Sequence, residues 1–379
     1  GSVDWDSPHM RSLYRYLDFC QESGIGVFLS QWEPHNCARA SDSYIPLNTA
    51  HPRNAWSLAE GLDHLIRRRG YSCITHLILF NEPNNMSGNW EAWLALLEHT
   101  RAELDARGLA DRVKLLGPDS VEFGDWLRRT VLRKHAWLDA YDVHRYALKE
   151  ELLAGDLENG LTGLIEFARR NDPQGWSKPF YVTEAGTWPA GTGTQVNPEI
   201  KTYVCGLEMA DYAVQALRAG VNAVSAWMME DSNLPPGLGG PDAPDYNWGL
   251  WGDKREGFAF RPWFYTWSLL TRLFPAGSVI YRMPQPEKVR LLAARKDLPD
   301  GRTDWSLCGV NRRDQPVTVE WILPVASSDT FQVYEYAETH RPTDAAGFPQ
   351  PVGTVTRETG QPLRRTLPPS SAVFLSSLT

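Results

Sequence analysis

Short apolar runs alternate with helix-like segments along most of the chain, and this alternation constrains the fold more than any other feature. Residues 25–29 and 77–80 are apolar throughout, and residues 113–116, 140–143, 180–183 and 223–227 fit the same pattern with one polar residue each. Several helix-like segments between them end in glycine, which is common just after a helix. Runs that are apolar throughout are typical of parallel strands buried on both faces. The pattern therefore predicts an α/β fold, and the number of units favours a (β/α)8 TIM-type barrel over an open sheet.

The pattern changes after a last helix-like segment at residues 261–274. Short strand-like segments such as 289–292 and 317–321 follow, with proline and glycine between them. This texture predicts an all-β accessory domain, a sandwich, at residues 276–379, behind a barrel catalytic domain at residues 1–275. The length of 379 residues fits a barrel of roughly 250 residues and a second domain of about 100.

Charge and composition argue against several classes of protein. The net charge is −8 and no run of lysine and arginine is present, so we expect no nucleic-acid partner. No apolar run approaches the length of about 18 residues that a membrane span needs. The five cysteines are widely spaced and lack metal-type pairing, so neither a disulfide framework nor a zinc site is expected. The compartment, cytoplasmic or secreted with a removed signal, and the oligomeric state stay open.

Two glutamates follow apolar runs in matching contexts. Glu82 lies just beyond residues 77–80, and Glu184 lies just beyond residues 180–183. A barrel brings the carboxyl ends of its strands to one mouth, where active sites lie. Two carboxyl groups there can cleave a glycosidic bond, because one can protonate the leaving oxygen while the other attacks the anomeric carbon. The alternative is that Glu82 caps a helix or lies on the surface.

The segments around both glutamates resemble motifs of the clan A glycoside hydrolases, particularly families 5 and 39. Asn81-Glu82-Pro83 is similar to the clan's acid/base motif at the end of its fourth strand, and Thr183-Glu184 is similar to its nucleophile at the end of the seventh. The resemblance covers roughly residues 5–275. It implies a retaining glycosidase with Glu82 as general acid/base and Glu184 as nucleophile. The implied substrate is a β-glycoside or an α-L-arabinoside, and no metal or organic cofactor is required.

The resemblance also implies further substrate-binding residues. Asn81 holds the place of an asparagine that bonds the sugar 2-hydroxyl, and Tyr146 holds that of a tyrosine that bonds the nucleophile or the substrate. His144 matches a histidine of the clan, although it could equally be a strand-end histidine that is hydrogen-bonded for structural reasons. The chain contains 16 tryptophans, many of them in loops, and such rings can stack on sugars. The expected aromatic contacts are Trp32, Trp227 and Trp248.

Other acidic and aromatic residues are weaker candidates. Glu33, Glu230 and Asp231 are rival carboxylates that we expect to be solvated or bonded within loops. Trp263 and Trp267 are spaced like neighbours on one helix face, so we expect them in the core.

The chain departs from the clan at its front. If Glu82 ends the fourth strand, about two βα units are missing before it, and we expect omitted upstream residues to supply them. Two other functions stay open. One is a non-catalytic carbohydrate-binding barrel protein. The other is a metal-dependent lyase or hydrolase, which would need several metal ligands at strand ends.

Overall fold

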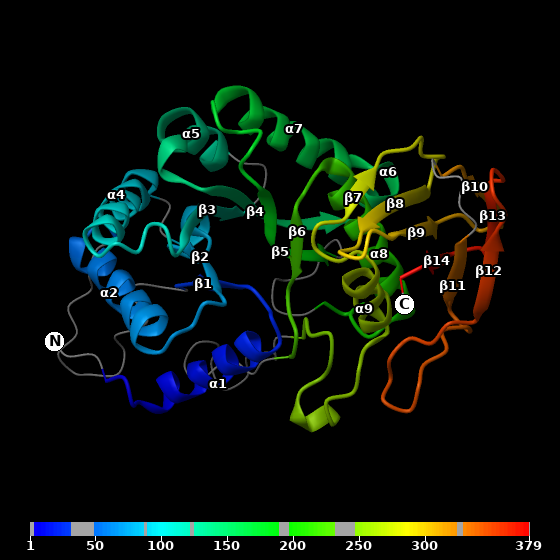
Figure 1. Cartoon of the computed structure of the whole chain (residues 1–379), viewed down its shortest axis with the longest axis horizontal. Helices are drawn as coiled ribbons and strands as arrows, with labels where there is room; N and C mark the ends of the chain where they lie inside the picture. Colours follow the sequence, from blue (N-terminus) through cyan, green and yellow to red (C-terminus); the bar gives the residue numbers. More distant parts are fainter. Residues whose placement is uncertain are drawn as a thin grey trace. The chain divides into compact units, whose positions relative to one another are not determined.

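The computed structural model describes residues 4–31, 49–86, 89–121, 125–188, 197–231, 247–323 and 329–378 (Figure 1). The chain forms two compact units, unit 1 with residues 1–144 and 164–183 and unit 2 with residues 145–163 and 184–379. It therefore passes from one unit to the other at 144/145, 163/164 and 183/184. The first and last of these points lie inside strands, β4 (Ala140–Leu148) and β5 (Phe180–Trp188).

Unit 1 consists of parallel strands and the helices between them. Its elements before β4 are α1 (Pro8–Glu22), β1 (Val27–Ser30), α2 (Pro52–Asp63), the π-helix η2 (His64–Arg68), β2 (Ile74–Ile78), α3 (Pro83–Met86), α4 (Trp90–Ala106), β3 (Lys114–Val121), α5 (Asp125–Lys134) and η3 (His135–Trp137). Strand β1 pairs in parallel with β2, β2 with β3, and β3 with β4. Helices α2 and α4 lie side by side in this unit (Figure 1). The predicted parallel α/β arrangement is confirmed.

Helix starts follow from capping residues in the sequence. The Ser7 side chain accepts a hydrogen bond from the Met10 backbone N–H, and Pro8 takes the first position of α1. The Asn89 side chain accepts a bond from the Ala92 backbone N–H at the start of α4 in the same way. These bonds satisfy backbone donors that have no partner inside the helix, so they fix where each helix begins.

Unit 2 continues β4 and β5 and adds α6 (Lys149–Ala154), α8 (Tyr203–Ala219), β6 (Ala223–Ala226), η4 (Lys254–Glu256) and α9 (Pro262–Leu273). Helix α7 (Asp156–Asn171) crosses the boundary between the units. The sheet that contains β4 has the order β1-β2-β3-β4-β5-β6 among the described residues. Six strands fit a partial barrel. Closure by eight strands stays a prediction.

The last part of unit 2 is antiparallel β structure, as the sequence predicts. Its strands are β7 (Val279–Tyr281), β8 (Val289–Asp297), β9 (Thr303–Asn311), β10 (Val317–Trp321), β11 (Asp329–Tyr336), β12 (Gly353–Arg357), β13 (Leu363–Leu367) and β14 (Ser371–Ser376). They form a six-stranded sheet, β12-β11-β14-β9-β8-β7, and a two-stranded sheet, β10-β13.

Alternate residues of the six-stranded antiparallel sheet pack into two different hydrophobic cores. Leu292 of β8 packs with α8 and α9, whose arrangement Figure 1 shows. Leu291 and Ala293, on the opposite face of β8, pack with Trp321 of β10 and Leu363 of β13. The period of two in a strand accounts for this division. One face of the large sheet is thus covered by helices and the other by the small sheet, which supports the sandwich prediction in part.

The change from helices to antiparallel strands falls between Leu273 and Val279. The compact units divide at other points of the chain, so the two domains at 1–275 and 276–379 stay a prediction. No described helix is long and apolar enough to cross a membrane.

Candidate active site

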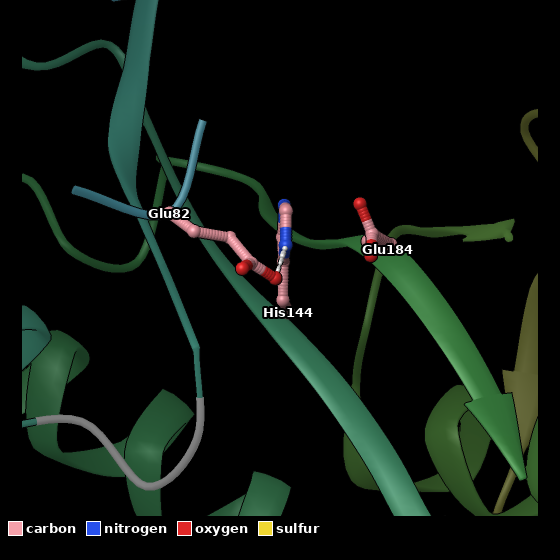
Figure 2. Close-up of side chains that lie close together, drawn as sticks. All are labelled: Glu82, His144 and Glu184. Carbon is pink, nitrogen blue, oxygen red and sulfur yellow. Dashed lines mark hydrogen bonds and ion pairs between the residues drawn. The ribbon is translucent and has the colours of Figure 1, made fainter. Parts of the chain in front are cut away.

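Glu82 lies in the turn that follows β2. The strand ends at Ile78, a little earlier than the sequence suggests, and α3 begins at Pro83. The backbone of Glu82 has φ +45°, which is unusual for a residue with a side chain and turns the chain sharply out of the sheet. Its side chain is 15% exposed. Oε1 lies 2.9 Å from Nδ1 of His144, the pair drawn in Figure 2, and Oε2 accepts a hydrogen bond of 3.1 Å from Asn85.

Neighbouring asparagines hold this turn in place. Asn81 is buried, and its backbone N–H donates to the carbonyl of Gln31 at the end of β1. The Asn84 side chain donates to and accepts from the backbone of Val121 at the end of β3. The turn is therefore bonded to the strands on both sides of β2, which restricts where the Glu82 carboxyl group can lie. The role of Asn81 toward a sugar hydroxyl stays a prediction.

Behind His144 lie two buried acids, Asp119 and Asp142. The distance from Nε2 of His144 to Oδ1 of Asp119 is 3.0 Å. The Asp119 backbone N–H donates to Oδ1 of Asp142 at 2.8 Å. Thr183 Oγ1 lies 3.1 Å from Asp119 Oδ1 and 3.0 Å from Asp142 Oδ2. Glu82, Asp119, Asp142, His144 and Thr183, here called the Glu82 cluster, all belong to unit 1.

The two acids have different protonation preferences. Burial raises the pKa of Asp119, but the charge of His144 and hydrogen bonds from His144, Asp142 and Thr183 outweigh burial, so its pKa is lowered. Burial and the negative charge of Asp119 raise the pKa of Asp142 well above its usual range. These directions favour a negative charge on Asp119 and a proton on Asp142.

Glu184 lies in unit 2, on β5, directly after Thr183 (Figure 2). It is 9% exposed. The Tyr146 hydroxyl donates a short hydrogen bond of 2.5 Å to Oε1 of Glu184. Gly186 lies against the Tyr146 ring, where a Cβ atom would come within 2.8 Å of the ring carbon Cε1. A residue without a side chain is therefore needed at 186 for the tyrosine to reach the glutamate.

The rings of two tryptophans pack against the Tyr146 ring. The Tyr146 ring centroid lies 5.7 Å from that of Trp188 and 5.5 Å from that of Trp248, both in near-perpendicular geometry. Tyr146, Glu184, Trp188 and Trp248 are here called the Glu184 cluster. Trp227 lies nearby along the sheet, since its backbone N–H donates to the carbonyl of Ala185. Aromatic rings thus pack around the tyrosine that bonds Glu184, a setting that suits a sugar.

The other residues considered from the sequence fall into three groups. Trp32 and the rival acid Glu33 lie outside the described residues. Asp231 is buried and bonded to Arg261 and to the backbone of Gly249, so it holds a loop, as expected. Trp263 is fully buried in a core cluster and Trp267 packs against it, which confirms the expectation that both are core residues.

Glu82, His144 and Glu184 are of the residue types that bind divalent cations. Each ring nitrogen of His144 already faces a carboxylate oxygen, at 2.9 Å and 3.0 Å, so a metal ion would have to displace one of these contacts. We assign no metal ligand here, and the expectation that the site needs none stays a prediction.

The sequence analysis missed Asp119, Asp142 and Trp188 as site residues. Asp119 comes soon after the largely apolar run 113–116, much as both glutamates come after such runs, and that position was a usable signal. Asp142 lies two residues before His144, on the same face of a strand. Trp188 ends the strand that carries Glu184. For Asp142 the sequence contains no sign of a partner, because its partner lies on another strand.

No protein-family profile and no curated protein sequence matches the chain. Its structure is similar to solved glycoside hydrolases. A family 30 endoxylanase from Clostridium papyrosolvens C71 is 12% identical, with a TM-score of 0.67 over 98% of this chain and 84% of that one. The family 39 enzyme from Xanthomonas axonopodis pv. citri is 15% identical, with a TM-score of 0.62 over 99% and 83%. The family 51 arabinofuranosidase from the same organism is 14% identical, with a TM-score of 0.62 over 96% and 78%. The chain thus has the fold of the clan A glycoside hydrolases, as its motifs imply.

Proposed function

We propose that the protein is a retaining glycoside hydrolase that uses Glu82 as general acid/base and Glu184 as nucleophile. The observation that carries the proposal is that each glutamate has a different polar partner. Glu82 contacts a ring nitrogen of His144 through Oε1, which leaves Oε2 to exchange a proton, and Glu184 accepts a hydrogen bond from the Tyr146 hydroxyl, which favours a carboxylate. The two groups are therefore suited to the two roles that glycosidic cleavage needs.

The chain itself links the two clusters. His144 and Tyr146 lie two residues apart on β4, and Thr183 and Glu184 are adjacent on β5. Residues two apart on a strand point to the same face. Strands β4 and β5 thus carry His144 and Thr183 of the Glu82 cluster as well as Tyr146 and Glu184 of the Glu184 cluster, which supports a single site that uses both glutamates.

In the first step, Glu184 Oε2 attacks the anomeric carbon while Oε1 stays bonded to Tyr146. The bond from the anomeric carbon to the leaving oxygen breaks, and Glu82 gives its proton to that oxygen. A covalent glycosyl-enzyme remains. In the second step, Glu82 takes a proton from water, the water oxygen bonds to the anomeric carbon, and the bond to Glu184 breaks. Two inversions give net retention of configuration.

The substrate class follows from the same site and the similar structures. Those structures include an endoxylanase and an arabinofuranosidase, which are named for pentose-containing substrates. The rings of Trp188 and Trp248, which pack on the Tyr146 that bonds Glu184, fit a carbohydrate. We propose a β-glycoside or an α-L-arabinoside as the substrate, with xylosides and arabinosides to be tested first.

A panel of 4-nitrophenyl glycosides tests the proposal. We expect turnover of at least one β-glycoside or α-L-arabinoside, unchanged by a chelator, and loss of turnover by several orders of magnitude in Glu184→Gly, since no covalent intermediate can form. Asp231→Asn is not a suitable control because it breaks a buried ion pair. Glu166→Gln, which changes an exposed acid of helix α7, serves as the control and should keep full activity.

Two outcomes would contradict the proposal. Sugar binding by calorimetry with no turnover of any glycoside would favour the carbohydrate-binding alternative. Turnover that disappears with the chelator and returns with a divalent cation would favour a metal-dependent enzyme.

A further inference from the structure

We propose that Asp119 is a positioning residue that keeps His144 doubly protonated, so that an N–H of His144 faces Glu82 throughout the reaction. The inference rests on the proposed function for its kinetic consequence. The state of His144 can be measured without any substrate, so the two can fail separately.

Asp119 reaches His144 because of a local irregularity in β3. Along the pair of strands β3 and β4, Gly117 pairs with Tyr141 and Ser120 pairs with Val143. Two residues of β3, Pro118 and Asp119, thus lie opposite one residue of β4, Asp142, and this extra residue forms a β-bulge. Asp119 lies in the bulge with φ +56°, a left-handed conformation that costs free energy for a residue with a Cβ atom. The bulge directs an acid to a histidine on the next strand, and bulges often orient functional side chains in this way.

The charge of the acid pair lies on Asp119. Oδ1 of Asp142 accepts from the Asp119 backbone N–H, while Oδ2 of Asp142 and Oδ1 of Asp119 both face the single proton donor of Thr183. If Asp142 is protonated at Oδ2, it can donate this proton to the hydroxyl oxygen of Thr183. The Thr183 hydroxyl can then donate its own proton to Asp119. Both acids are almost completely buried, at 2% and 0% exposure, so two negative charges in contact would be very costly. One charge with one proton satisfies every contact.

His144 lies between two acids and so receives two proton acceptors. It is 2% exposed. The titratable groups that face it in unit 1 are Glu82 from the turn after β2, Asp119 from β3 and Asp142 from its own strand. An ionised Asp119 accepts Nε2–H, and a charged imidazole then presents Nδ1–H to Glu82.

This arrangement separates the two oxygens of Glu82. Oε1 accepts from Nδ1–H in both steps of the reaction, because His144 keeps both protons. Oε2, bonded to the exposed side chain of Asn85, is the oxygen that gives the proton to the leaving group and takes it back from water. A neutral histidine with a bare Nδ1 would instead place a lone pair against the Glu82 carboxylate after the first step. Asp119 prevents this by neutralising the charge of the imidazolium.

Nitrogen NMR of the full chain with ¹⁵N-labelled histidine tests the state of His144 directly. The chain contains nine histidines, and the His144→Gln spectrum identifies the signals of His144. We expect both ring nitrogens of His144 to be protonated at pH 7 and above, where an ordinary histidine is neutral. A neutral His144 in the unmodified protein at pH 7 would overturn the proposal without the need for any variant.

Two isosteric variants identify the acid responsible. Asp119→Asn removes the negative charge, so His144 should lose one proton at pH 7. Asp142→Asn replaces a group that is already neutral, so His144 should stay doubly protonated. The reverse result, or the same result for both variants, would show that the charge does not lie on Asp119. Circular dichroism confirms that each variant is folded before its spectrum is compared.

The pH profile measures the effect on Glu82. The kcat/KM for an aryl glycoside with a poor leaving group falls at high pH when Glu82 loses its proton. A cation beside a carboxyl group favours its ionised form, so loss of the imidazolium charge in Asp119→Asn should move the alkaline limb of the profile to higher pH. An unmoved limb would refute the link to Glu82. If the unmodified protein turns over no glycoside, the proposed function fails, while the NMR result still decides whether Asp119 controls His144.

Discussion

Replacing Gly186 with alanine tests how far catalysis depends on the contact between Tyr146 and Glu184. A Cβ atom at residue 186 would lie 2.8 Å from Cε1 and 2.9 Å from Cδ1 of Tyr146. Carbon atoms in favourable contact are about 3.5–4.0 Å apart, so the ring must move by about 0.7 Å or more. It moves against Trp188 and Trp248, which already pack on it. The hydrogen bond of 2.5 Å to Glu184 is then stretched or lost.

The size of the effect follows from the kind of hydrogen bond. A hydrogen bond to a charged group contributes about 1.5–3 kcal/mol. If this bond keeps Glu184 ionised and oriented for attack, its loss should lower kcat/KM by about 10- to 150-fold. The fold should change little, because the strain falls on one ring at the site.

The assay compares kcat/KM of Gly186→Ala, Tyr146→Phe and the double variant with one aryl glycoside. Tyr146→Phe removes the hydroxyl but keeps the ring, so both single variants should lose similar activity and the double variant should lose no more than either. Gly163→Ala is the control, since a Cβ atom there would meet nothing within 4 Å. Losses that multiply in the double variant would refute the reasoning, because alanine would then act by a route other than the Tyr146 hydroxyl.

Three further predictions concern roles, spacing and stability. Azide should give a product of retained configuration with Glu82→Ala and of inverted configuration with Glu184→Gly, and the opposite pairing by proton NMR would mean that the two roles are exchanged. A crystal structure should place the carboxyl groups of Glu82 and Glu184 about 5 Å apart, whereas more than about 9 Å would exclude a retaining pair. Arg312 pairs with the buried acids Glu208 and Asp211, whose pKa values are raised, mainly by burial. Acids with raised pKa values destabilise the fold as pH rises through those values. Urea unfolding should therefore show that Arg312→Leu lowers the free energy of unfolding by about 3–5 kcal/mol at pH 7 and by less at pH 5. An equal loss at both pH values would contradict this prediction.

The parallel sheet and the candidate glutamates could be predicted from local patterns. A strand buried on both faces tends to be apolar, so the first residues of β3, β4 and β5 are visible as largely apolar runs. A carboxylate just beyond such a run is costly unless it is used or paired, which is why Glu82 and Glu184 stand out. The antiparallel strands after residue 278 are visible for a similar reason, since Val289 to Asp297 begins as a short apolar segment between turns.

Tertiary structure alone decided which acids and rings join those glutamates. Asp119 and His144 are 25 residues apart, and they meet because a bulge and a left-handed backbone at Asp119 redirect its side chain, which no periodicity in the sequence indicates. In the sequence, Asp142 is one acid among others on a strand. Only its burial beside the charge of Asp119 raises its pKa and favours its protonated form. Trp188 becomes part of a site because Gly186 lets Tyr146 lie against the strand. Local sequence determines which residues a strand buries. Which charge is neutralised, and by what, depends on distances between strands that are set only when the sheet assembles.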